Sequence, residues 1–386
     1  MFGPRCTSVC TRCRTHCDTN RAPTTPYATL DLVDLAALGW NALFEASFAE
    51  HAQRQSVPAR VILEHQHIYR VQTAEAERLA TVAGGLRYRA AGRHEFPAVG
   101  DWVALRRPEP GRRAVIHAVL PRRSKFSRKV AGDETGEQVV AANIDTVFLM
   151  MGLDADFNVR RIERYLITAW DGGASPVVLL NKTDVCNDVA GRVREVEDVA
   201  SGVPVLAIST RRDEQLAAID PYLMPARTIA LLGSSGVGKS TLVNRLVGHD
   251  RQRTREVRVA DQKGRHTTTR RELVVLPGGA LLIDTPGLRE LQLWDGSGGM
   301  SAAFEDIEAL GAGCRFRDCR HDAEPGCAVK AAVAGGRLGA DRLASFHLLL
   351  KEQAWLLDRQ DEHAAQERKR QTRIISKVIR DFKPRE

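Results

Sequence analysis

Residues 228–248 read TIALLGSSGVGKSTLVNRLVG, which is an apolar run, a glycine-rich loop and a helix-forming run in succession. The loop Gly233–Ser240 matches the pattern G-x-x-x-x-G-K-S, in which successive backbone N–H groups and the N-terminus of the next helix face phosphate groups. Lys239 would place its ammonium on the β- and γ-phosphate oxygens, and the Ser240 hydroxyl would ligate Mg2+. The stretch therefore predicts a nucleotide site at the end of a strand in a mostly parallel α/β sheet.

A second motif, Asn181-Lys-Thr-Asp184, follows the apolar run PVVLL and has the N-K-x-D pattern that reads guanine in GTPases. The Asp184 carboxylate can accept from N1–H and the 2-amino group of guanine, whereas adenine offers no donor at those positions. We expect Asn181 to brace the phosphate loop and the stem of Lys182 to lie along the base. Ser209, at the end of VPVLAIS, falls where a second guanine-contacting loop would be.

A third motif, Asp284-Thr-Pro-Gly287, ends the apolar run ALLID. Asp284 can hold Mg2+ through water, and the Gly287 N–H can sense the γ-phosphate. From the segment 264–269 (GRHTTT) we expect Thr268 to ligate Mg2+ when GTP orders the loop. An ordinary GTPase runs from the phosphate loop through the switch threonine and DxxG to NKxD. Here NKTD comes first, so the sequence predicts a circularly permuted GTPase.

The motifs do not include a residue that orients the attacking water. Leu288 follows the DTPG motif, where a Ras-like enzyme carries a glutamine, so we expect slow intrinsic hydrolysis and a partner or another side chain in that role. His266 is a candidate because it is polar and lies in the switch segment; the alternative is a solvent-facing histidine without a catalytic role. The predicted catalytic residues are His266, Lys239 and Thr268. The predicted nucleotide-binding residues are Asn181, Lys182, Thr183, Asp184, Ser209, Gly233, Ser234, Ser235, Gly236, Val237, Gly238, Lys239, Ser240, Thr241, Asp284 and Gly287.

A cysteine and histidine cluster lies nearer the C-terminus. Cys314, Cys319, His321 and Cys327 supply three thiolates and one imidazole within fourteen residues, enough to close a tetrahedral zinc site. The surrounding segment GCRFRDCRHDAEPGC is too polar to pack a core of its own, so metal would replace the missing hydrophobic energy. We therefore predict one structural Zn2+ per chain, together with Mg2+ bound at Ser240 and Thr268 with GTP.

The positive charge of the chain is concentrated in one segment. The 386 residues carry 56 Lys+Arg and 48 Asp+Glu, a net charge of +8. Between Arg60 and Val130 there are 15 Lys+Arg and 6 Asp+Glu, a difference of +9, so the remainder sums to about −1. Short β-type runs separated by Gly and Pro in this segment predict a five-stranded barrel of the OB type that binds RNA, with salt-sensitive contacts at Arg122, Arg123 and Lys125. The alternative is a barrel that only packs on its neighbour.

The first 29 residues have no apolar periodicity and predict a disordered leader. Its cysteines, Cys6, Cys10, Cys13 and Cys17, could instead hold a metal. The chain has neither an apolar run of membrane-spanning length nor a signal peptide before Tyr27, so we expect a cytoplasmic protein without membrane contact. We further expect a monomer.

The order NKTD, GSSGVGKS, GRHTTT, DTPG and Cys-Cys-His-Cys, behind an OB-like segment, resembles the RsgA (YjeQ) family of circularly permuted GTPases. The likeness begins at about Leu30 and includes the stretch NVRRIERYL at 158–166. It implies a multidomain protein: an N-terminal helix and OB-fold RNA-binding domain at 30–130, a permuted GTPase domain at 131–295, and a zinc-binding and C-terminal helical domain at 296–386.

The same resemblance implies a function. It predicts GTP hydrolysis stimulated by the small ribosomal subunit, rRNA binding, a role in late subunit maturation, and contact with other assembly factors. Two alternatives remain open from the sequence. One is a permuted GTPase of the large subunit, against which the C-terminal cluster and the OB segment argue. The other is a nucleotide-gated RNA-binding protein with negligible turnover, which the absent glutamine permits.

Overall fold

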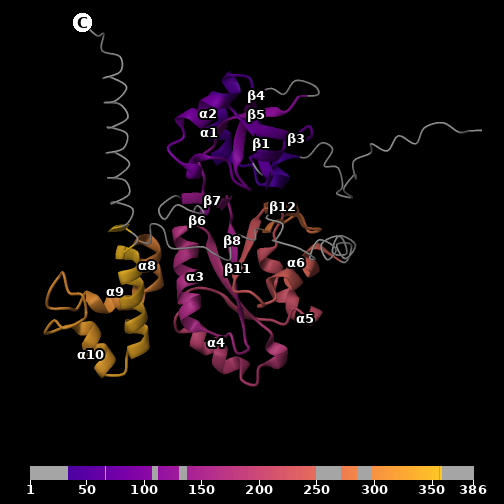
Figure 1. The fold of residues 1–386 in the computed structure, drawn as a ribbon. Coiled ribbons are helices and arrows are strands. Elements are labelled where there is room, and N and C mark those ends of the chain that lie inside the picture. Colours follow the sequence, from indigo (N-terminus) through magenta and orange to yellow (C-terminus); the bar gives the residue numbers. More distant parts are fainter. Residues whose placement is uncertain are drawn as a thin grey trace, which may run out of the picture.

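The computed structural model describes residues 34–65, 67–106, 112–129, 137–248, 271–284, 297–355 and 357–358. The segments 1–29 and 264–269, on which several predictions fall, lie outside these residues. In Figure 1 a β-barrel lies above an α/β sheet, and a group of short helices lies beside one of the helices of that sheet.

The barrel consists of five strands in the order β1-β2-β3-β5-β4, closed by pairing of β4 with β1. All neighbours are antiparallel except β3 and β5. Its interior is filled by small and branched apolar side chains and Tyr69. The predicted five-stranded barrel is therefore confirmed. The strands are β1 (Ser56–His65), β2 (Ile68–Gln72), β3 (Glu77–Val82), β4 (Trp102–Arg106) and β5 (Ala114–Val119).

Short helices cover the outside of the barrel. A 3-10 turn η1 (Leu35–Leu38) leads through Gly39, in the left-handed region at φ 86°, into α1 (Ala42–Gln53). The Asn41 side chain caps α1 by accepting from the N–H groups of its first turn, and the Trp40 ring packs 4.7 Å from that of Trp102. The helix expected at the start of the domain is therefore present. The shorter elements α2 (Gly84–Arg89) and η2 (Arg93–Glu95) lie between β3 and β4.

The α/β sheet continues from the barrel without interruption. Its order is β10-β9-β8-β11-β13-β12, parallel except for β12, and β12 pairs in turn with β1 of the barrel. A hairpin of β6 (Lys125–Lys129) and β7 (Glu137–Ala142) joins the two parts and spans the predicted border at residue 130. The domain borders therefore stay predictions. The sheet strands are β8 (Thr146–Gly152), β9 (Ser175–Asn181), β10 (Val205–Ala207), β11 (Thr228–Gly233), β12 (Arg271–Val275) and β13 (Leu281–Asp284).

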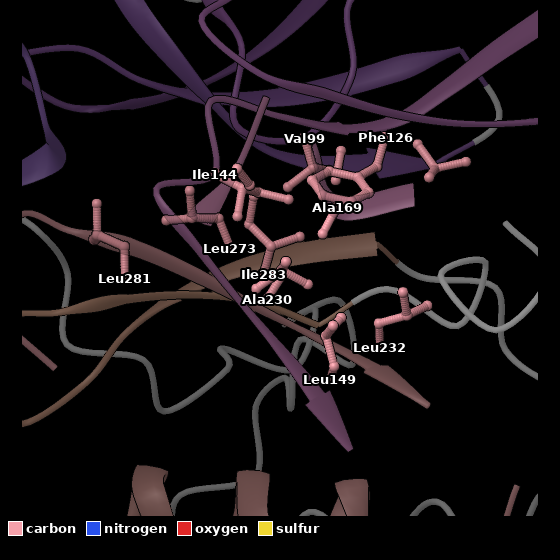
Figure 2. Packing of buried hydrophobic residues seen from close by; sticks show 14 of the residues in the cluster. Val99, Phe126, Ile144, Leu149, Ala169, Ala230, Leu232, Leu273, Leu281 and Ile283 are labelled. Carbon is pink, nitrogen blue, oxygen red and sulfur yellow. The ribbon is translucent and has the colours of Figure 1, made fainter. Parts of the chain in front are cut away.

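The sheet is buried on both faces, as its continuous apolar strands predict. Along β8, Leu149 belongs to the core shared with α3 and α4, whereas Phe148 and Met150 belong to the core shared with α6. Figure 2 shows part of the first core, in which Ile144, Ala230 and Ile283 lie together and Phe126 of the hairpin lies near Val99 and Ala169. The helices and 3-10 turns are α3 (Val159–Asp171), η3 (Thr183–Val185), α4 (Val189–Glu197), α5 (Asp213–Leu216), η4 (Ala217–Tyr222) and α6 (Lys239–Val247).

The C-terminal helices pack on α3 (Figure 1). They are α8 (Ser297–Ala303), α9 (Glu305–Gly311), α10 (Ala328–Ala334) and a helix that includes residues 340–355. The fully buried Glu163 of α3 accepts from Arg342 Nη1 at 2.6 Å, and Arg342 also pairs with Asp306 at 3.0 Å. Because a buried carboxylate is costly without a partner, this contact fixes the C-terminal helices on α3.

Arg60 joins the N-terminal turn, the barrel and the GTPase sheet. Its side chain is 1% exposed and donates to the carbonyl oxygens of Leu38, Gly100 and Asn143 and to the Thr228 hydroxyl at 2.8 Å. Burial lowers the pKa of Arg60 to about 10, with Asp145 and Asp101 opposing the shift. The guanidinium therefore stays charged at neutral pH, and its acceptors come from segments far apart in the chain.

Replacing Arg60 by Met should destabilise the junction, because four buried acceptors lose the arginine donor and, among the described residues, only the Gly100 carbonyl keeps another, from Asn143. We expect the free energy of unfolding to fall by about 3 kcal/mol. Thermal and denaturant unfolding measure this, with Arg54→Met, an exposed arginine after α1, as the control. If Arg60→Met unfolded at the same temperature and denaturant concentration as the wild type, this account of the junction would be contradicted.

Candidate guanine-nucleotide site and metal cluster

The phosphate loop connects β11 to α6, as predicted. Gly233, Gly236 and Gly238 have positive φ angles of 159°, 81° and 103°. A Cβ on Gly238 would lie 2.3 Å from Asn181 Nδ2, and one on Gly233 would lie 2.5 Å from the Met150 carbonyl oxygen. Both positions therefore require glycine, one for its conformation and both for close approach. The Lys239 ammonium donates to the carbonyl oxygens of Gly233 and Ser234, so it lies over the loop.

The guanine motif follows β9 and contacts the phosphate loop directly. Asn181 is 1% exposed; its Nδ2 donates to the Val237 carbonyl oxygen at 2.7 Å, and its Oδ1 accepts from the Thr210 N–H at 2.9 Å. The Ser209 hydroxyl donates to Asp184 Oδ1 at 2.7 Å. That hydrogen bond is the main reason why the pKa of Asp184 lies below its usual range. The carboxylate is therefore ionised at neutral pH, the state in which it can accept from guanine.

Some of the remaining predicted site residues lie in the described part of the chain, and four predicted positions lie outside it. Asp284 ends β13 at the same edge of the sheet as the two loops, and Ser240 and Thr241 are exposed at the start of α6. Thr183 donates from its hydroxyl to Gln215 at 2.8 Å. Four predicted residues or positions lie outside the described part of the chain: His266, Thr268, Gly287 and Leu288. Their roles stay predictions.

Two acidic residues at this edge were missed from the sequence. Asp154 and Asp156 follow β8, and their carboxylates contact Lys182 of the guanine motif and Ser234 of the phosphate loop. They belong to no motif, and their only signal in the sequence is their place after a buried parallel strand, where ligands bind in open α/β sheets.

The cysteine and histidine cluster is assembled between α9 and α10. The ligand atoms of Cys314, Cys319, His321 and Cys327 all lie within 4.8 Å of one another. The Sγ atoms of Cys314 and Cys327 are 3.9 Å apart, and His321 Nδ1 is 3.6 and 3.5 Å from them. Tetrahedral zinc with bonds of about 2.3 Å to sulfur separates its ligands by roughly 3.7 Å. The donor set and spacing therefore fit one structural zinc ion.

The cluster also belongs to a small core. This core includes the three cysteines of the cluster, Phe304 between α8 and α9, and Ile167 of α3. The Ala328 and Lys330 N–H groups point to the Sγ atoms of Cys314 and Cys327 at 3.4 Å each. Metal bound here would hold the segment between α9 and α10 in place beside α3.

The sheet order, the phosphate loop and the N-K-x-D loop define a P-loop GTPase in which the guanine motif precedes the phosphate loop. A family model described as RsgA GTPase matches residues 119–294. A small ribosomal subunit biogenesis GTPase RsgA of Opitutus terrae is 51% identical over 336 residues, covering 85% of this chain and 92% of the relative. A second relative, RsgA 2 of Lactiplantibacillus plantarum, is 48% identical and covers 79% of this chain and 86% of its own length.

Solved structures agree with the fold. The crystal structure of YjeQ from Thermotoga maritima has a TM-score of 0.58 at 25% identity, covering 78% of this chain and 99% of its own. YloQ, described as a circularly permuted GTPase, has a TM-score of 0.56 at 22% identity and covers 78% and 95%. The chain belongs to the RsgA GTPase family, and it is a GTP hydrolase. The resemblance found in the sequence is thereby confirmed.

Membrane contact was expected to be absent. Within the described ranges, no helix has both the length and the apolar character that crossing a bilayer requires.

Removing one ligand from the cluster should release the metal. We expect Cys327→Ser to lower bound zinc from one per chain to nearly none and to lower the thermal midpoint, because metal binding contributes to the folding free energy of such sites. Elemental analysis and thermal unfolding measure both quantities. Cys186→Ser, at a half-buried cysteine of the GTPase domain, is the control. Unchanged zinc in Cys327→Ser would show that these four residues do not form the site.

Proposed function

We propose that this chain hydrolyses GTP during late maturation of the small ribosomal subunit, that it binds rRNA, and that the subunit stimulates its turnover. The observation that carries the proposal is the 51% identity to a small ribosomal subunit biogenesis GTPase over 85% of the chain. The geometry of the guanine and phosphate loops supports the GTP-dependent part.

The proposed nucleotide chemistry uses the residues predicted from the motifs. Asp184 reads guanine, Lys239 and the phosphate-loop N–H groups bind the phosphates, and Ser240, Thr268 and Asp284 serve Mg2+ directly or through water. His266 is proposed to orient the attacking water. Mg2+ would supply charge neutralisation on the β- and γ-phosphates, while the protein fixes the position of the nucleotide.

The basic residues first expected to contact RNA are engaged within the chain. Arg122 forms an ion pair with the fully buried Asp101 at 2.7 Å, Lys125 pairs with Glu137 at 2.9 Å, and Arg123 pairs with Asp145. The Arg122 pair joins the segment before the hairpin to the barrel, and the Lys125 pair joins the two strands of the hairpin. The Arg122 side chain is only 15% exposed, which argues against an RNA contact there, whereas salt-sensitive RNA contacts at Arg123 and Lys125 stay predictions.

We propose that rRNA also contacts what we call the α2 surface, defined by Arg87, Tyr88, Arg89, Arg106 and His117. All five are exposed, and Tyr88 is 92% exposed. Arg106 of β4 pairs with Val115 of β5, two residues before His117, and α2 contacts β5, so these cations lie on one side of the barrel. Partial burial and then the nearby charges of Arg106 and Arg89 lower the pKa of His117. An exposed aromatic ring among arginines suits single-stranded RNA, because bases stack on the ring while the cations contact phosphates.

The proposed activity is tested by GTP turnover with and without small ribosomal subunits. We expect slow turnover alone and a rise of at least about tenfold with subunits, since positioning of the water contributes on that scale or more. Large subunits serve as the control and test the alternative of a large-subunit factor. Equal rates with and without small subunits would contradict stimulation.

Neutralising the α2 surface should weaken the electrostatic part of subunit binding. We expect Arg87→Gln/Arg89→Gln to reduce the slope of log affinity against log salt by about 1.5, since each phosphate contact contributes roughly 0.7 to 0.9. Arg54→Gln/Arg194→Gln removes two exposed arginines, one just after α1 and one in α4, and is the charge-matched control. Equal slopes for the two double variants would place the RNA contact elsewhere.

A further inference from the structure

The loop between β8 and α3 lies between the two loops that bind the nucleotide. Its Asp154 forms an ion pair with Lys182 of the guanine motif, and both side chains are about one-third exposed. Its Asp156 accepts from the Ser234 hydroxyl at 2.5 Å and from Arg161 Nη1 at 2.7 Å. One short loop of the chain thus contacts both the base-reading and the phosphate-binding residues.

The backbone around Asp154 is built for its contact with Lys182. Lys182 has a φ of 71°, in the left-handed region that residues other than glycine rarely adopt. The Leu153 N–H donates to the Asn181 carbonyl oxygen at 2.8 Å, which fastens the Asp154 loop to the guanine motif. A Cβ on Gly152 would lie 2.7 Å from Asp154 Oδ1, because that carboxylate folds back over the end of β8. The pairing of Asp154 with Lys182 therefore follows from several independent local constraints.

The contacts of Asp156 balance its own charge. A carboxylate close to a phosphate loop would repel nucleotide if it stood alone. The Arg161 guanidinium, followed by the Ser234 hydroxyl, keeps the pKa of Asp156 below its usual range, and the hydrogen bond from Lys182 does the same for Asp154. Both carboxylates are thus ionised and paired. Asp156 can then fix the Ser234 side chain while Arg161 offsets its negative charge.

We propose that Asp154 and Asp156 are positioning residues for the guanine nucleotide. Asp154 holds the Lys182 ammonium, so that the lysine stem is already in place along the base before nucleotide binds. Asp156 holds Ser234 and with it the start of the phosphate loop. In both cases the carboxylate reduces the side-chain freedom that binding would otherwise remove. This inference rests on the GTPase activity of the chain and adds two residues that no sequence motif contains.

The inference is tested by the affinity for GDP, measured without ribosomal subunits. We expect Asp154→Asn to weaken GDP binding about threefold to fivefold, the effect of a partly exposed ion pair. Asp154→Glu keeps the charge and should recover binding to within about twofold of wild type. Because Asp154 acts through Lys182, the double variant Asp154→Asn/Lys182→Met should bind GDP no more weakly than Lys182→Met alone.

The control is Glu77→Gln, which removes a carboxylate of similar exposure that pairs with Arg70 on the barrel. Glu77→Gln should leave GDP affinity unchanged. Without nucleotide, the thermal midpoints of Glu77→Gln and Asp154→Asn should be equal. Wild-type GDP affinity in Asp154→Asn, or additive losses in the double variant, would overturn the role of Asp154. The measurement needs no subunits, so an absence of subunit stimulation would not affect it.

A second cycle tests Asp156 and does not depend on how Asp154→Asn folds. Asp156→Asn should weaken GDP binding about threefold. In the Ser234→Ala background the same substitution should have no further effect on GDP affinity. Additive losses from Asp156→Asn and Ser234→Ala would overturn the proposed link between Asp156 and the phosphate loop.

Discussion

The side-chain amide of Asn181 holds together the phosphate loop and the second guanine loop. It donates to Val237 in the phosphate loop and accepts from Thr210 in the second guanine loop, and it is almost fully buried. Its nitrogen occupies the space that any side chain at position 238 would need. Water cannot replace the hydrogen-bond partners of a buried amide. If the loops moved apart, several hydrogen bonds would be lost at once, so the amide fixes their relative position. The order of the motifs along the chain is therefore unimportant to the site, provided that the sheet brings the same strand ends together.

The permutation changes what lies beside the site. The stretch between α6 and β12 contains the predicted switch segment 264–269, and β12 pairs with β1 of the barrel through Leu63 and Glu64. There the largely buried Arg271 pairs with Glu64 at 2.8 Å. On the other side, α3 carries both the Arg161 contact to Asp156 and the buried Glu163 contact to Arg342. The barrel and the C-terminal helices are thus fastened to elements that adjoin the nucleotide loops.

The sequence predicted the parts of this structure that depend on local chemistry. A phosphate loop needs glycines and a lysine in fixed order, a guanine reader needs a carboxylate, and a zinc cluster needs soft ligands at short spacing, so each motif was found and assembled as expected. Contacts between distant segments were not predictable in this way. Nothing in the sequence pairs Arg60 with Thr228, or Asp156 with Ser234. Arg122 shows the same limit, because a basic residue in a basic segment looked available for RNA until its buried partner Asp101 was seen.

We propose that the GTP-bound state of this chain is the one that binds the small ribosomal subunit. It is tested most directly by measuring subunit binding with GDP, with GTP and with a non-hydrolysable GTP analogue. The account predicts tight binding with the analogue, weak binding with GDP, and release during turnover with GTP. Equal affinity with GDP and with the analogue would contradict it, because a ligand without differential affinity for two states cannot shift the equilibrium between them.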